Sequence, residues 1–212
     1  TGFAAPLGVA GHAAIRLAVG TWARAAVLRW HRAHPEPRHI LIGETPLVGE
    51  RLMELARPRD DDVEALLAGD GTRFVVPVPS GEVRRVIEDA RTREMADPRH
   101  ARDAKSAPPE VVRAHWDDIE RVAVALGAAR PRTPGEYDPD LYAAAYQRVL
   151  RHRRVLIVRL TRVVRVGASE HEAPTGATEL VPSPDEVASA MSEVEPLPLE
   201  EIQRRALYWY RT

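Results

Sequence analysis

The stretch VLIVRLTRVVRV at residues 155–166 carries most information about the fold. It is rich in valine, leucine and isoleucine, which is typical of a β-strand that packs against a core. Two shorter apolar runs share this character, RFVVPV at residues 73–78 and HILIG at residues 39–43. We therefore predict three β-strands, and Pro77 either places the middle one at a sheet edge or ends its pairing there.

Segments with helical periodicity separate these strands. We predict helices at His12–His34, Pro46–Ala56, Val63–Leu67, after Ser80, at Pro109–Gly127, from Asp138, at Pro184–Val194 and at Pro198–Tyr210. Strands that alternate with helices predict an α/β fold, helix-rich, with a predominantly parallel sheet flanked by helices. Three strands are few for such a sheet, and a further N-terminal strand would complete it better.

The predicted organisation is one α/β body with a helical appendage. We expect residues 1–166 to form the body and residues 167–212 to form a C-terminal extension packed on it. Residues 84–109 are expected to form an arginine-rich lid, because Met95–Pro109 is polar and rich in Arg, Asp and Pro.

Composition excludes several classes of protein. The chain has 212 residues, a formal net charge of −1 and no cysteine, so disulfides and thiolate chemistry are excluded. No apolar run is long enough to cross a bilayer, and no signal peptide precedes the first helix, so we expect a cytoplasmic protein without membrane contact. The near-neutral charge argues against nucleic acid as a partner.

Ligands of an open parallel sheet bind beyond the carboxyl ends of its strands, which directs attention to Glu44. It follows the apolar run 39–43 directly, and an acid there is suited to orienting substrate or magnesium. The alternative is that Glu44 complements the dipole of a helix that begins at Pro46.

A series of cations follows the predicted strand at residues 73–78. Arg84, Arg91, Arg93 and Lys105 are the candidates for binding phosphate, since arginine forks stabilise phosphoryl oxygens. The alternative is a solvated helix face on which the arginines pair with neighbouring acids at helical spacing. The basic run at residues 151–154 is expected only to cap the preceding helix.

The order of these elements resembles the nucleotide and small-molecule kinases of the P-loop NTPases, including the zeta-toxin type. The resemblance spans about residues 11–166 and is carried by HILIGETPL at 39–47, by FVVPVPS at 74–80 with the arginines after it, and by Tyr137-Asp138-Pro139 with the strand that follows. It implies an ATP-dependent phosphotransferase that uses magnesium and acts on a small-molecule or nucleotide substrate. Glu44 would be its catalytic residue and would orient substrate or metal, and Arg84, Arg91, Arg93 and Lys105 would hold phosphate.

The Walker A loop that defines this family is absent from the chain. Lys105, in Ala-Lys-Ser, has no glycine-rich loop before it, so either that loop lies upstream of Thr1 in a longer protein or the chain does not bind ATP in this way. The alternative function is a non-catalytic binding or regulatory module with an NTPase-like body. Its aromatic C-terminus, Tyr208-Trp209-Tyr210, would then dock a partner or a second copy, unless these rings simply pack onto the protein.

Overall fold

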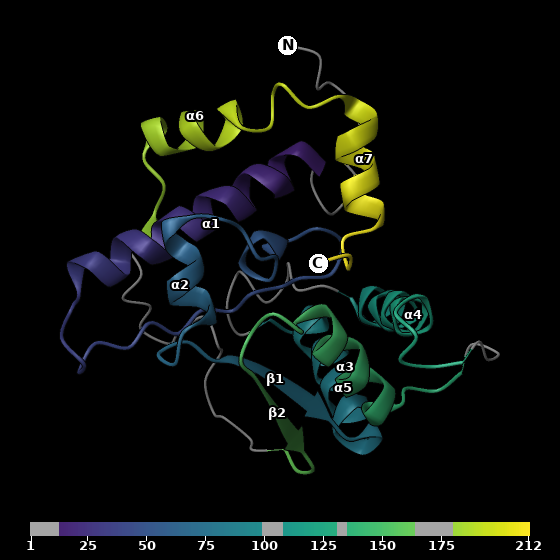
Figure 1. The fold of residues 1–212 in the computed structure, drawn as a ribbon. Coiled ribbons are helices and arrows are strands. Elements are labelled where there is room, and N and C mark those ends of the chain that lie inside the picture. Colours follow the sequence, from purple (N-terminus) through teal and green to yellow (C-terminus); the bar gives the residue numbers. More distant parts are fainter. Residues whose placement is uncertain (1–12, 99–107, 131–134, 164–179) are drawn as a thin grey trace. The chain divides into compact units, whose positions relative to one another are not determined.

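The computed structural model describes residues 13–98, 108–130, 135–163 and 180–212. Within these ranges the chain is helix-rich and contains one small sheet of two parallel strands (Figure 1). This confirms a helix-rich α/β chain. The described residues divide into two compact units, the first made of 13–72, 152–154 and 180–212 and the second of 73–98, 108–130, 135–151 and 155–163.

The first unit is built around one long helix. Its elements are α1 (Ala13–Ala33), the 3-10 helix η1 (Met53–Leu55), α2 (Asp62–Ala68), α6 (Pro184–Ser192) and α7 (Leu199–Leu207). Small and apolar residues on one face of α1, including Leu17 and Ala18, are buried against Ala190, Val194 and Ile202 of the C-terminal segment. Figure 1 shows α6 running alongside α1, and the small side chains of α1 allow this close approach.

The second unit contains the sheet. Its elements are β1 (Phe74–Pro79), α3 (Gly81–Ala96), α4 (Pro109–Ala125), α5 (Pro139–Val149) and β2 (Val155–Leu160). The strands pair in parallel from Phe74 opposite Val155 to Pro79 opposite Leu160. The ladder ends where α3 begins, because the Ser80 N–H donates to Leu160 O at 2.8 Å while the Ser80 hydroxyl caps α3 by accepting from Val83 N. The carboxyl ends of both strands therefore lie beside the first turn of α3.

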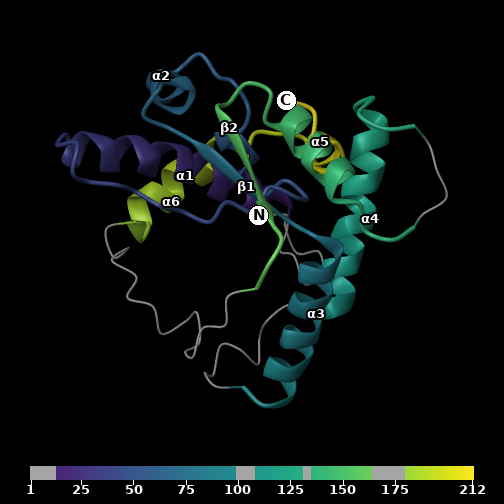
Figure 2. The ribbon, with the colours of Figure 1, turned by 90° about the horizontal axis from the view of Figure 1, so that it is seen from below.

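Alternate residues of β1 face opposite sides of the sheet. Val76 and Val78 are buried, and α5 and α3 pack on this strand (Figure 2). Val75 and its register partner Leu156 are 55% and 51% exposed, so the other face carries apolar side chains that remain in contact with solvent.

Two predicted elements are wrong and one is shorter than predicted. Residues 39–43 form no strand, and the predicted helix 46–56 is a turn followed only by η1. A strand requires a ladder partner, and the described part of the chain offers none to residues 39–43. The strand predicted at 155–166 ends at Leu160, residues 161–163 continue without regular structure, and 164–166 lie outside the described residues.

The remaining predicted helices are confirmed by α1 to α7, with α2 and α3 at the positions expected from the sequence. α3 is regular through Ala96, so residues 84–96 of the predicted lid are helical. None of the helices within the described ranges combines the length and hydrophobicity that a membrane span requires.

Candidate functional site

The predicted acid and the predicted arginines belong to different units. Glu44 lies in the irregular segment of the first unit that follows α1, and its side chain is exposed. It makes no ion pair with another described residue. Because no helix begins at Pro46, Glu44 has no helix dipole to complement, which removes that alternative.

The predicted arginines of the second unit all lie on α3, but on two of its faces. Arg84 and Arg91 are seven residues apart and share a face of the helix, whereas Arg93 projects from the opposite face. Arg93 is exposed, and its Nε donates to the Asp89 carbonyl at 3.2 Å. Lys105 lies outside the described residues. α3 therefore presents a pair of arginines on one face rather than a cluster of three.

Arg84 is held by contacts within the second unit. Its Nε lies 3.0 Å from the Glu88 carboxylate, and its Nη2 donates to Val112 O at 3.1 Å. The guanidinium also stacks over the Tyr137 ring at 4.5 Å and lies 6.0 Å from the Trp116 centroid. This arginine ties α3 to α4 and to the segment before α5, and the contact with Glu88 is the helical pairing that the second interpretation predicts.

An aromatic ladder continues from Tyr137. The Tyr137, Tyr142 and Tyr146 rings follow one another with centroids 5.8 and 4.8 Å apart, and Trp116 meets Tyr137 edge-on at 5.1 Å. Burial raises the pKa of all three tyrosines. The Tyr137 hydroxyl is buried without a hydrogen-bond partner in the described structure, so it keeps its proton at neutral pH.

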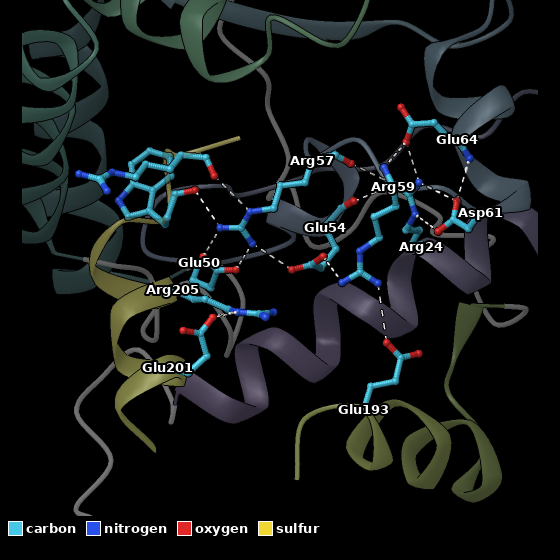
Figure 3. A network of polar contacts seen from close by, with 12 residues as sticks. Arg24, Glu50, Glu54, Arg57, Arg59, Asp61, Glu64, Glu193, Glu201 and Arg205 are labelled. Atoms are coloured by element: carbon cyan, nitrogen blue, oxygen red, sulfur yellow. Dashed lines mark hydrogen bonds and ion pairs between the residues drawn. The ribbon is translucent and has the colours of Figure 1, made fainter. Parts of the chain in front are cut away.

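The most extensive polar cluster lies in the first unit and was not predicted (Figure 3). We call it the arginine network; its members are Arg24, Glu50, Glu54, Arg57, Arg59, Asp61, Glu64 and Arg153. Arg24 and Arg153 are almost fully buried, as are Glu50 and Glu54. Charges of both signs alternate through the network, which is the condition for burying them.

Arg24 joins α1 to the start of α2. Its Nε and Nη2 bind both oxygens of Asp61 at 2.7 Å, and Nη2 also reaches Glu64 at 2.7 Å. Asp61 is at the same time the N-cap of α2, because one of its oxygens accepts from the N–H groups of Val63 and Glu64. One carboxylate thus satisfies a guanidinium fork and a helix end.

The arginines also satisfy backbone carbonyls around η1. Arg24 Nη1 donates to Glu54 O at 2.9 Å, while Arg153 donates to Leu55 O and Arg57 O, each at 2.7 Å. These carbonyls belong to a short stretch in which few carbonyl groups accept a backbone hydrogen bond. The arginine side chains supply the missing hydrogen-bond donors.

Arg57 and Glu50 form the other end of the network. Arg57 binds both oxygens of Glu50, and its Nη2 donates to the Trp209 carbonyl at 3.1 Å. Glu50 has φ of 67°, an uncommon backbone conformation for a residue with a side chain. The paired guanidinium holds Glu50 in this turn.

The pKa values of two carboxylates in the network, Glu50 and Glu64, are shifted in opposite directions. Burial raises the pKa of Glu50, and the Arg57 pair only partly offsets this. Burial acts in the same sense on Glu64, but hydrogen bonds from Arg153 and Arg24 outweigh it and lower the pKa of Glu64 to about 2. Glu64 is therefore fully ionised at neutral pH and is the stronger electrostatic contributor to the fold.

A small cavity of about 180 Å³ opens beside this network, between α1 and α6. It is lined in part by Trp22, Arg59 and Glu193. Arg59 is paired with Glu54 and approaches Glu193 at 3.7 Å (Figure 3). Because the cations around the cavity are neutralised by neighbouring acids, the network has the chemistry of a structural clamp rather than of an anion site.

The aromatic C-terminus is partly packed onto the first unit, and docking of a partner through it stays a prediction. Trp209 is buried in the first unit and its carbonyl accepts from Arg57, so this ring packs onto the protein. Tyr208 is 36% exposed and lies 4.3 Å from the Arg211 guanidinium.

Sequence reasoning missed the arginine network because its members are far apart in the chain and follow no motif. The basic run 151–154 was expected to cap a helix, and Arg151 does donate weakly to Arg148 O at 3.5 Å. Arg153 instead donates hydrogen bonds to the carbonyls of Leu55 and Arg57, about a hundred positions earlier in the chain. Comparisons with known proteins add no assignment, since no family model, curated protein or solved structure matches the chain.

Proposed function

We propose that the chain is an ATP-dependent phosphotransferase that acts on a small molecule or a nucleotide. The supporting observation is the geometry of the second unit. The carboxyl ends of β1 and β2 meet the first turn of α3, and α3 carries Arg84 and Arg91 on one face. In parallel α/β proteins this edge of the sheet is where phosphate ligands bind. The proposal includes a larger, predominantly parallel sheet than the two strands described.

Each cation has a different capacity for phosphate in this proposal. Arg84 is already neutralised by Glu88 and stacked on Tyr137, so its role would be to position α3. Arg91 lies about two helical turns after Arg84 on the same face of α3 and is half-buried. Arg93 is exposed. Arg91 would steady phosphoryl charge, together with Lys105, whereas Arg93 lies on the opposite face of α3 and would contact a phosphate only from that side.

Magnesium would require little from the protein. Among the described residues no three acidic or histidine side chains gather in the manner of a metal cage. Magnesium in phosphotransferases commonly takes one or two carboxylates and completes its shell with water and substrate phosphates. Glu44 is exposed and has no ion-pair partner among the described residues, so its carboxylate has the chemistry for this limited role. Bound magnesium would neutralise charge on the phosphates.

The test is calorimetry with ATP–magnesium, followed by ADP release with a panel of nucleosides, nucleoside monophosphates and small alcohols. We expect ATP binding, and ADP formation that depends on one class of acceptor. Arg91→Ala should lower turnover at least tenfold with little change in unfolding temperature, whereas the matched variant Arg148→Ala, an exposed arginine on α5, should leave turnover unchanged. Absence of both ATP binding and ADP release would overturn the proposal.

A second candidate function is a non-catalytic binding or regulatory module. The observation that favours it is the neutralisation of Arg84, since a cation that is paired and stacked in the ligand-free chain has less affinity to offer phosphate. Under this candidate, ATP–magnesium produces no heat of binding, and Arg84→Ala changes stability alone.

A further inference from the structure

An apolar segment of the first unit has the features of a strand without a partner. The segment, residues 38–45, lies between Pro37 and Pro46, which lack backbone N–H groups and limit any ladder at both ends. From His39 to Leu47 the chain runs without a turn or a bend. We call it the Ile40 segment.

Exposure differs between its two faces around Leu41, while His39 and Gly43 are exposed as well. Ile40 and Ile42 are 77% and 90% exposed, whereas Leu41 between them is half-buried. Arg38 and Glu44 share the outward positions with the two isoleucines, and both are exposed. Along the outward face a cation is therefore followed by two apolar residues and an anion.

The backbone of the segment is also open. His39 N donates to Glu36 O at 3.1 Å, but from Ile40 to Thr45 no backbone group is hydrogen-bonded to another described residue. Exposed isoleucines on a chain with open N–H and C=O groups form a template for strand addition.

We propose that a second copy of this chain covers the Ile40 segment, and that the two segments pair as antiparallel strands about a two-fold axis at Leu41. In this register Ile40 of each copy faces Ile42 of the other, and Arg38 faces Glu44. All four cross-strand pairs on the outward face are then either apolar or of opposite charge. The segment is thus complementary to itself, which is what a symmetric dimer requires.

The only other described partner for the Arg38 guanidinium is weak. Arg38 lies 3.4 Å from Glu36 on the same chain, in an exposed pair with a 78% exposed arginine side chain. Glu44 has no ion-pair partner among the described residues. A cross-strand pair from Arg38 to Glu44 therefore displaces little and should be screened by salt.

A two-stranded ribbon is a small interface, so the dimer should be weak and concentration-dependent. Sedimentation equilibrium of the full chain over a wide concentration range measures it. We expect Ile42→Lys to raise the dissociation constant by about tenfold or more, because both copies of the Ile40–Ile42 pair are lost in a symmetric dimer. Val181→Lys is the matched control, since Val181 is another exposed β-branched apolar residue of this unit, at 66%, and its substitution should leave dimerisation unchanged.

Charge reversal tests the register. Arg38→Glu and Glu44→Arg should each weaken self-association, because each places like charges opposite one another. An equimolar mixture of the two variants should form the mixed dimer in native mass spectrometry. In that dimer residue 38 of each chain faces a residue 44 of opposite charge. Circular dichroism of each variant confirms that it is folded.

Two results would overturn the proposal. One is a monomer at all concentrations in the unsubstituted protein, and the other is equal dimerisation of the Ile42→Lys and Val181→Lys variants. Neither readout involves ATP, so failure here is distinguishable from failure of the proposed phosphotransferase activity.

Discussion

The Arg153 guanidinium binds the Glu64 carboxylate at 2.6 Å, although the two residues are 89 positions apart in the sequence. The arginine side chain is fully buried, and Glu64 receives a second guanidinium from Arg24. This pair joins the three residues before β2 to α2.

Glu64→Gln should destabilise the first unit by about 3 kcal/mol at neutral pH, because it leaves Arg153 and Arg24 short of a counter-charge in a buried place. The effect should depend on pH. The folded-state pKa of Glu64, about 2, lies below its ordinary value of 4.5, so the stability it contributes is present above pH 4.5 and is lost as pH falls toward 2. Urea unfolding between pH 7 and pH 2.5 measures this.

The control for this experiment is Glu200→Gln, which removes an exposed carboxylate from α7. It should change the free energy of unfolding by less than about 0.5 kcal/mol at any pH. A Glu64→Gln variant whose stability difference from the unsubstituted chain is the same at pH 7 and pH 3 would contradict the assignment.

Asp61 allows its two roles to be separated. Asp61→Asn keeps a side-chain oxygen for the α2 N-cap but removes the charge facing Arg24, whereas Asp61→Ala removes both. Both variants should be destabilised, with the alanine variant lower by about a further 1 kcal/mol, which is the usual contribution of an N-cap. Equal loss in the two variants would show that the cap contributes nothing.

Gly20 tests the close approach of α1 to η1. An added Cβ would lie 2.9 Å from Glu54 Cγ, and that side chain is held by Arg57 and Arg59. Gly20→Ala should therefore lower the unfolding temperature, although alanine is favoured over glycine inside a helix by about 1 kcal/mol. At Gly81, in the first turn of α3, an added Cβ meets nothing within 4 Å, so Gly81→Ala should be neutral or stabilising. Stabilisation at both positions would show that the Gly20 contact relaxes.

Tyr137→Phe addresses the buried hydroxyl of the second unit. The Tyr137 O–H has no partner in the described structure, and removing an unsatisfied polar group is expected to leave stability unchanged or raise it by up to about 1 kcal/mol. Thermal unfolding followed by calorimetry is a suitable measurement, because fluorescence of the chain combines four tryptophans, of which Trp116 packs against this ring at 5.1 Å. A loss of more than about 1 kcal/mol would mean that the hydroxyl is hydrogen-bonded in solution.

The helices could be predicted from the sequence because their periodicity and caps are local. Asp138 before Pro139, for example, is a recognisable helix start and is the N-cap of α5. The run HILIG at 39–43 has strand composition but no partner among the described residues, and pairing is a non-local condition that composition does not contain.

The candidate site shows the same division between local and distant information. The place of Arg84 on a helix after β1 was predictable, whereas its stacking on Tyr137 depends on the segment before α5, about fifty residues later. The arginine network could not be predicted at all, since Arg24, Glu64 and Arg153 are brought together by tertiary packing alone.

The arginine network also has a consequence for the order of events during synthesis. Arg153 belongs to the first unit but follows nearly the whole of the second unit in the chain. The carbonyls around η1 therefore emerge from the ribosome about a hundred residues before the side chain that binds two of them. The helices of the second unit from α3 to α5 can form before Arg153 has been made, while the N-terminal unit must remain incomplete until translation has passed β2 and the C-terminal helices have joined α1.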